Sequence, residues 1–187
     1  MIIRQFFALL RYKEITMKVL LISDLTPHLS SLTALLQDCV SSGASVGFLP
    51  PVKNEQAEQY WSAVQLELDS VPTPRLMIGA FEGEQLVGCV QLSLADKSNA
   101  QHRAEVEKLM VHTRHRGKGI SKQLLSQLEI EAKQHKRTLL VLDTRLGDIA
   151  SDLYKRMGYT EAGRIPNFAL SANGQLDSTI YFYKSIS

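Results

Sequence analysis

Hydrophobic and polar residues follow one another along the chain with two different periods, and each period predicts one type of element. Short runs rich in branched apolar residues and bounded by turn residues predict strands, whereas apolar residues recurring every three or four positions predict helices. Strands are therefore expected at residues 18–23, 75–81, 85–94, 104–111, 138–142, 159–165 and 178–184. Helices are expected at residues 29–43, 54–70, 119–134 and 148–156.

The order of these elements predicts the class of the fold. The strand–helix–strand unit from Ala104 to Leu142 predicts a right-handed crossover between two parallel strands. A long loop at residues 166–177, containing Pro166-Asn167 and Asn173-Gly174, lets the last two strands pair antiparallel. We therefore expect an α/β protein with a mixed α+β sheet and helices on both faces of that sheet.

Length and composition narrow the class of protein. A chain of 187 residues with 44% hydrophobic and 21% charged residues is expected to form one domain with its own core. No apolar run approaches the roughly 20 residues that cross a bilayer. The formal net charge of +2 gives no long-range field for nucleic acid or an acidic membrane. We therefore expect neither of these as a partner.

The N-terminal segment and the cysteines give two further expectations. Residues 1–16 are apolar but interrupted by basic residues, unlike a signal peptide, and Met17 stands just before the first predicted strand. We expect residues 1–16 to be a dispensable extension and residues 17–187 to be the single domain. Cys39 and Cys89 are too few for a disulfide framework and indicate reduced thiols in a cytoplasmic protein.

The clearest chemical signal lies at residues 109–122 (LMVHTRHRGKGISK), where a strand ends and a basic loop opens a helix. The first turn of a helix has unpaired N–H groups and a partial positive charge, so it suits an anion. Gly117 and Gly119 let phosphate oxygens approach the backbone closely. Four basic residues can supply charge around them: Arg114, Arg116, Lys118 and Lys122.

Two common phosphate-binding motifs are each excluded by one residue. A P-loop needs Ser or Thr after Gly-Lys, where this chain has Gly119, and the dinucleotide fingerprint needs glycine where it has Lys122. What remains is Arg-x-x-Gly-x-Gly, beginning at Arg114, between a strand and a helix. This arrangement resembles the pyrophosphate loop of the GNAT acetyltransferase superfamily.

Other segments resemble the same superfamily in the same order. Residues 104–111 resemble its fourth strand, and residues 150–159 (ASDLYKRMGY) resemble its A-x-x-L-Y-x-x-x-G-F/Y segment. A closer likeness to the tabtoxin-resistance group, which acetylates a small β-lactam amino-acid toxin, rests on five segments: 43–48, 103–111, 136–137, 142–144 and 180–182. The resemblance covers most of the chain and implies a GNAT-like fold. Such a sheet is mostly antiparallel, with a parallel strand pair at the coenzyme site.

The resemblance implies transfer of an acetyl group from acetyl-CoA, as co-substrate, to a primary amine of a small amino-acid-like molecule. It implies that the backbone of Leu109, Met110 and Val111 pairs with the pantetheine arm. Backbone amides of residues 117–121 would hold the pyrophosphate. The implied coenzyme site therefore also includes Ile120 and Ser121, with the four basic side chains as charge support.

The chemistry also requires a base for the substrate ammonium and an acid for the leaving thiolate. The resemblance implies Glu105 and Asp143 as carboxylates on adjacent strands, where burial and mutual repulsion raise a pKa. Strand alternation puts Glu105 and Glu107 on one face, so geometry does not choose between them. The choice of base stays open among Glu105, Glu107 and Asp143. Tyr154 matches the tyrosine that protonates the thiolate in many relatives, and packing in the core is its structural alternative. Gly147 departs from the family, whose members often carry Asn there.

Several alternatives remain at this point. His112 and His115 are three residues apart without a third ligand nearby, so we expect no metal site. Within the superfamily, the acceptor could instead be a protein or peptide. In a different class, the chain could be a non-catalytic acyl-CoA-binding sensor. GNAT proteins are often dimers, so the resemblance leaves a homodimer open.

Overall fold

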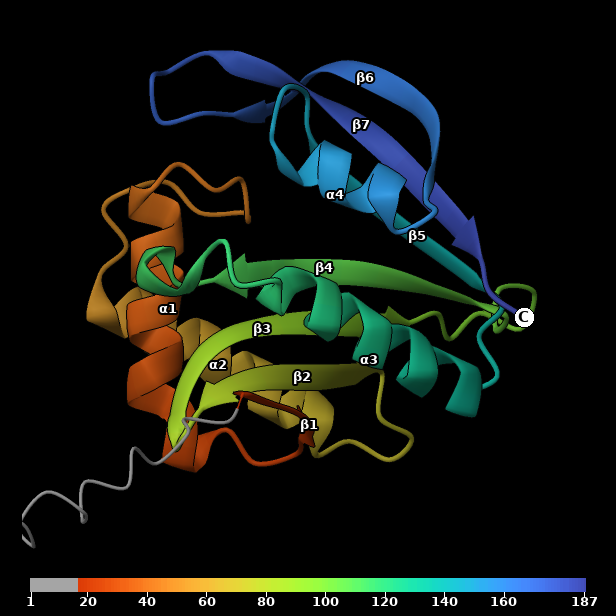
Figure 1. Cartoon of the computed structure of the whole chain (residues 1–187), viewed down its shortest axis with the longest axis horizontal. Helices are drawn as coiled ribbons and strands as arrows, with labels where there is room; N and C mark the ends of the chain where they lie inside the picture. Colours follow the sequence, from red (N-terminus) through yellow and green to blue (C-terminus); the bar gives the residue numbers. More distant parts are fainter. Residues whose placement is uncertain (1–16) are drawn as a thin grey trace, which may run out of the picture.

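The computed structural model describes residues 17–187, and its elements follow the predicted order (Figure 1). The expected extension, residues 1–16, lies outside the described residues. The strands are β1 (Met17–Ile22), β2 (Arg75–Glu82), β3 (Gln85–Leu94), β4 (Arg103–Val111), β5 (Leu139–Arg145), β6 (Thr160–Leu170) and β7 (Leu176–Ser185). The helices are α1 (Leu29–Ser41), α2 (Asn54–Leu68), α3 (Ile120–Gln134) and α4 (Ala150–Arg156), with short 3-10 turns η1 (Thr26–His28) and η2 (Thr113–His115).

The seven strands form one sheet in the order β1-β2-β3-β4-β5-β7-β6. Neighbouring strands pair antiparallel except β4 and β5, which pair parallel and are connected by α3. This confirms the predicted mixed sheet with a single parallel pair, produced by the crossover between residues 104 and 142. The prediction succeeded because the helix returns the chain to the end of the sheet at which the first strand began, so the second strand runs parallel to the first.

Two hydrophobic cores lie on opposite faces of the sheet. On one face, α3 and α4 pack against the sheet around Leu124 and Phe182, both fully buried. On the other, α1 and α2 pack around Trp61, which is also fully buried. Adjacent residues of β2 belong to different cores: Met77 packs in the core under α1 and α2, and Ile78 in the core under α3 and α4. This alternation is the period of two expected for a strand covered on both faces.

The helices are amphipathic, and each buries one side. α3 buries the predicted stripe that includes Ile120, Leu124 and Leu128, while Ile130, which falls off that stripe, is 49% exposed. A helix with one apolar stripe lies on a core rather than within one. Among residues 17–187, no helix is both long enough and apolar enough to span a membrane.

The predicted loop at residues 166–177 is wrong in its extent. β6 continues through Pro166 and Asn167 to Leu170, and only a short turn separates it from β7 at Leu176. β6 is the last strand of the sheet, so a proline there does not remove a hydrogen bond to a second neighbour. The pairing with β7 is interrupted between Ile165 and Ala169, which accommodates the proline as an irregularity within the strand.

Candidate active site

The parallel strands β4 and β5 separate along their length and open a cleft. They pair only from Arg103 to Glu105 on β4, against Leu139 to Val141 on β5. Beyond that point β4 stays with β3 and β5 stays with β7, and Figure 1 shows the two strands diverging toward their carboxyl ends. Two adjoining cavities lie in this opening, of about 520 Å³ and about 330 Å³. We refer to the larger as the loop cavity and to the smaller as the acidic cavity.

A β-bulge in β4 changes which side chains face the cleft. Met110 pairs with Cys89 and Glu107 pairs with Gln91, so Lys108 and Leu109 together lie opposite one residue of β3. Lys108 has a φ of 51°, in the left-handed region. Strict alternation therefore fails here, because Glu107 and Lys108 both face the side of the sheet covered by α2.

The loop cavity is built from the end of β4, the loop into α3, and α4. Gly117 and Gly119 have φ values of 78° and 77°, which a residue with a Cβ adopts only at a cost. Gly119 is the N-cap of α3 and has no side-chain cap. The backbone N–H groups of residues 117–119 donate to no backbone carbonyl of residues 17–187. The loop therefore presents unpaired donors at a helix N-terminus, an arrangement that binds phosphate.

The predicted coenzyme residues fall into two groups in the structure. Most of them line the loop cavity: Leu109, Met110, Val111, Arg116, Gly117, Gly119, Ile120, Ser121 and Lys122. Arg114 and Lys118 do not, and the Lys118 ammonium instead pairs with Glu82 at 3.0 Å.

Arg116 is held by the protein itself. Its Nε donates to the Val111 carbonyl at 3.0 Å and its guanidinium donates to the Ser42 hydroxyl at 2.8 Å. Arg116 thus braces the loop against α1, and the Val111 carbonyl already has a donor.

Tyr154 lies where the two cavities meet and lines both. α4 places it there, and its side chain packs against Tyr159 and Phe182 while remaining only 6% exposed. Burial raises the pKa of the Tyr154 hydroxyl, and the carboxylates of Asp143 and Asp148 raise it further. The hydroxyl therefore keeps its proton at neutral pH and is able to donate it.

The acidic cavity distinguishes the two glutamates that alternation left equivalent. Glu107 accepts a hydrogen bond from Arg75 at 2.8 Å within a polar network that includes the fully buried Gln91. Glu105 forms no ion pair within residues 17–187. Burial raises the pKa of Glu105, and repulsion from Glu107 and Asp143 adds to the shift. Of the two, Glu105 has the properties of a base.

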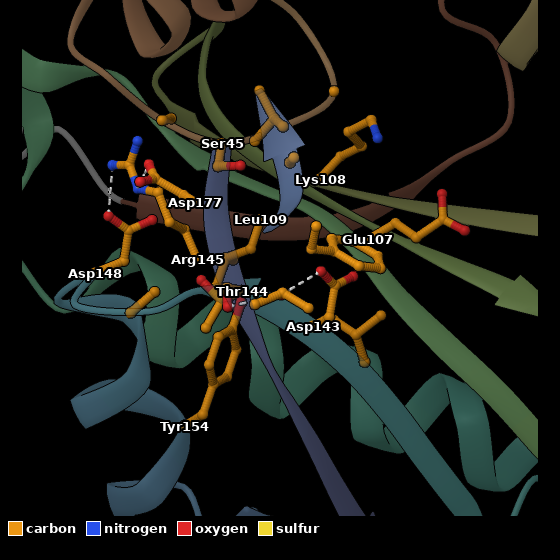
Figure 2. Close-up of a pocket in the computed structure, with 18 of the residues that line it drawn as sticks. Ser45, Glu107, Lys108, Leu109, Asp143, Thr144, Arg145, Asp148, Tyr154 and Asp177 are labelled. Carbon is orange, nitrogen blue, oxygen red and sulfur yellow. Dashed lines mark hydrogen bonds and ion pairs between the residues drawn. The ribbon is translucent and has the colours of Figure 1, made fainter. Parts of the chain in front are cut away.

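Asp143 is held in the acidic cavity by β7. Thr179 donates from its hydroxyl to Asp143 at 2.7 Å, and this bond is drawn in Figure 2. An aspartate that accepts a short hydrogen bond is fixed in position. Both predicted carboxylates therefore line the same cavity as Tyr154.

Sequence reasoning missed Arg145, which joins three segments around the cavities. Its guanidinium donates to the Gly43 carbonyl at 2.9 Å. It also donates to Asp148 at 2.7 Å, and its Nε lies 3.9 Å from Asp177 (Figure 2). Gly43 lies in the loop between α1 and α2, and Asp177 lies on β7. Arg145 therefore fixes that loop and the β6–β7 hairpin over the end of β5. No sequence motif identifies it, because its partners are remote in the chain.

The histidines of the loop are engaged with carboxylates. His112 Nδ1 lies 3.7 Å from Asp38, and His115 Nδ1 lies 2.9 Å from Glu82. Asp38 also accepts hydrogen bonds from the amide and hydroxyl of Thr113, both at 2.7 Å. These contacts fasten the loop to α1 and to the β2–β3 turn. Within the described residues, no group of three or more His, Cys, Asp or Glu could hold a metal ion.

Comparison with solved structures identifies proteins of the same fold. One is a Salmonella typhimurium protein assigned as an acetyltransferase and solved with its cofactor acetyl-CoA (18% identity, TM-score 0.74, covering 92% of this chain and 95% of that one). Another is the ribosomal-protein-alanine N-acetyltransferase of Brucella melitensis (21%, 0.72, 89% and 99%). A third is a protein assigned as a phosphinothricin N-acetyltransferase (18%, 0.75, 92% and 99%).

A match to a sequence family establishes more than the fold. The sequence model of the acetyltransferase (GNAT) family matches residues 33–159, which is more than half of the chain. The matched segment includes β4 with its bulge, the glycine loop before α3, and Tyr154. On this evidence, the chain belongs to the GNAT family of acetyltransferases.

Proposed function

We propose that the protein is an acetyl-CoA-dependent N-acetyltransferase whose acceptor is the primary amine of a small amino-acid-like molecule. The observation that carries this proposal is the junction of two cavities at Tyr154, one lined by an anion-binding loop and the other by carboxylates. A transferase needs such a junction, because donor and acceptor must meet at the reacting bond. The solved acetyl-CoA complex of the same fold supports the identity of the donor.

The loop cavity fits the donor. The unpaired amides of residues 117–119 and the left-handed Gly117 and Gly119 suit the coenzyme diphosphate. Lys122 lines the same cavity and adds positive charge. The separation of β4 from β5 beyond Glu105 leaves the edge of β4 open to the pantetheine arm. Acetyl-CoA, when bound, supplies the acetyl thioester on which the amine acts.

The residues of the acidic cavity then move the protons. Glu105 takes a proton from the substrate ammonium, which frees the nitrogen lone pair for attack on the acetyl carbon. As the carbon–sulfur bond breaks, the Tyr154 hydroxyl gives its proton to the sulfur. The extra proton on the newly acylated nitrogen then returns to the Tyr154 phenolate, which leaves a neutral amide. Asp143, fixed by Thr179, raises the pKa of both Glu105 and Tyr154 by its negative charge. Asp143 therefore tunes both the group that accepts a proton and the group that donates one.

Release of free thiol from acetyl-CoA tests this function. The purified chain is incubated with acetyl-CoA and a panel of amines: amino acids, aminoglycosides, polyamines and β-lactam amino acids. We expect thiol release with small amino-acid-like amines, and calorimetry should show acetyl-CoA binding in the absence of any amine. Failure to bind acetyl-CoA at millimolar concentration would refute the proposal.

The resemblance to the tabtoxin-resistance group and the fold shared with a phosphinothricin N-acetyltransferase both favour a toxin-like amino acid as acceptor. The fold shared with a ribosomal-protein-alanine N-acetyltransferase keeps a protein acceptor as the alternative. An acidic cavity of about 330 Å³ favours the small molecule. A peptide array assayed beside the amine panel separates the two. A non-catalytic sensor would bind acetyl-CoA yet release no thiol with any amine.

We also propose that residues 17–187 act as one domain in the cytoplasm. Cys39 and Cys89 are both buried free thiols, which is compatible with a reducing compartment. A homodimer stays a proposal that sedimentation analysis checks directly. A chain beginning at Met17 should bind acetyl-CoA as well as the full chain does.

A further inference from the structure

The acidic cavity contains one cation that has no carboxylate partner. Lys108 lines the cavity and is half-buried, yet it takes part in no ion pair within the described part of the chain. Its ammonium lies 6.0 Å from the centre of the Tyr60 ring and 3.7 Å from where a Cβ at Gly47 would stand. The other cation of the cavity, Arg145, is already bound by Asp148.

The backbone places Lys108 in the cavity at a cost. A φ of 51° is disfavoured for a residue with a Cβ, and persists only where the surrounding structure imposes it. Without the bulge, Lys108 would lie on the α3 side of the sheet with Val106. The bulge instead puts its ammonium beside Tyr60 of α2 and the loop that contains Gly47.

The cavity therefore has charges of both signs in separate places. In Figure 2 the Asp143 carboxylate of β5 lies below the Lys108 side chain of β4, and the Lys108 ammonium is directed away from Asp143. The adjacent Glu107 is held by Arg75, whereas Glu105, which also lines the cavity, forms no ion pair within the described residues. A ligand with one ammonium and one carboxylate matches this separation, because each charged group finds an opposite charge.

We propose that Lys108 binds the carboxylate of the acceptor and so makes the enzyme selective for amino acids over simple amines. This inference rests on the proposed function, since it assigns the other end of the molecule whose amine is acetylated. Lys108 is then a specificity residue, and takes no part in proton transfer. A carboxylate ligand can form a charge-assisted hydrogen bond with a lysine ammonium that has no carboxylate partner in the protein.

Matched pairs of substrates test the proposal: L-lysine with cadaverine, L-histidine with histamine, and L-phenylalanine with phenethylamine. Within each pair only the carboxylate differs. Steady-state thiol release gives kcat/KM for the wild type and for the Lys108→Met variant, whose side chain is unbranched, one atom shorter and uncharged. Lys108→Arg keeps the charge, and Lys133→Met, at an exposed position on α3, is the control for removing a surface lysine.

For every pair that the wild type acetylates, we expect it to prefer the acid. Lys108→Met should lower kcat/KM for the acid about tenfold to a hundredfold, the range for a hydrogen bond to a charged group. The value for the decarboxylated amine should stay within twofold, as should acetyl-CoA affinity by calorimetry. Lys108→Arg should restore part of the preference. Lys133→Met should behave as the wild type.

The failures of the two proposals are distinguishable. If the wild type releases no thiol with any of these compounds or with the wider amine panel, the proposed function fails, and this inference fails with it. If amines are acetylated but the acid and its decarboxylated partner respond equally to Lys108→Met, only the role of Lys108 is overturned. Equal losses for both partners together with weaker acetyl-CoA binding would show that Lys108 is a structural residue of the bulge.

Discussion

Replacing Gly119 by alanine separates the conformational role of the glycine loop from its role in binding. Gly119 has a φ of 77°, and a Cβ built there meets no atom within 4 Å. The cost to folding is therefore conformational only, about 1–2 kcal/mol for an alanine in the left-handed region. For a chain of this length, that cost lowers Tm by about 2–8 °C.

Binding should suffer more than folding does. A methyl group on Gly119 keeps the diphosphate away from the loop amides, and a hydrogen bond between an amide and a charged group contributes about 1.5–3 kcal/mol. We therefore expect the Kd for acetyl-CoA to rise by roughly tenfold to a hundredfold, measured by calorimetry at a temperature where the variant is fully folded.

A matched control exists in Gly174, between β6 and β7, whose φ is 81° and whose Cβ would also meet nothing within 4 Å. Gly174→Ala should lower Tm to a similar extent and leave acetyl-CoA affinity unchanged. If Gly119→Ala and Gly174→Ala weaken binding equally, or if neither does, the assignment of the loop as the diphosphate site is refuted.

Four further substitutions give distinct outcomes. Tyr154→Phe should lower kcat roughly a hundredfold or more, with acetyl-CoA affinity little changed, because a proton donor is lost. An unchanged kcat would show that Tyr154 does not donate the proton. The pKa of Glu105 is raised by burial and by neighbouring carboxylates, so kcat/KM should fall as pH falls through that raised pKa. Glu105→Gln should abolish this fall in kcat/KM at low pH, whereas Glu107→Gln should keep it. Glu105→Gln should also raise the free energy of unfolding at neutral pH, because the ionised glutamate is unfavourable in the folded state. A fall at low pH that survives Glu105→Gln would assign the base to another residue. Trp61→Ala should destabilise the protein by about 3–5 kcal/mol, since the side chain is fully buried between α2 and the sheet, and a change in Tm of less than about 5 °C would contradict that packing.

Elements with strong local periodicity were predicted closely. The predicted helix at residues 54–70 is α2 (Asn54–Leu68), and the strand at residues 85–94 is β3 (Gln85–Leu94). Their apolar spacing is set by the face that each element buries, so it is visible within a short window. The predicted strand at residues 159–165 ended too early because Pro166 is typical of a loop. A proline is tolerated within β6 because this strand lies at the edge of the sheet.

Local sequence pattern identified only the part of the site whose residues are consecutive, whereas Glu105, Asp143 and Tyr154 were expected from the family resemblance. The glycine loop is a local motif, and its placement at the start of α3 follows from a strand preceding a helix. The choice between Glu105 and Glu107 was not accessible, because it depends on Arg75, 32 residues before Glu107. Arg145 is a similar case, since it contacts the carbonyl of Gly43 across 102 residues of sequence. Such pairings arise from the sheet order, which no local pattern encodes.

A crystal structure of the protein with acetyl-CoA tests most directly whether donor and acceptor meet at Tyr154. We predict that the thioester sulfur lies within hydrogen-bonding distance of the Tyr154 hydroxyl, with the acetyl group directed into the cavity that holds Glu105 and Asp143. A coenzyme bound with its thioester outside the junction of the two cavities, or with its diphosphate away from residues 117–121, would contradict the account.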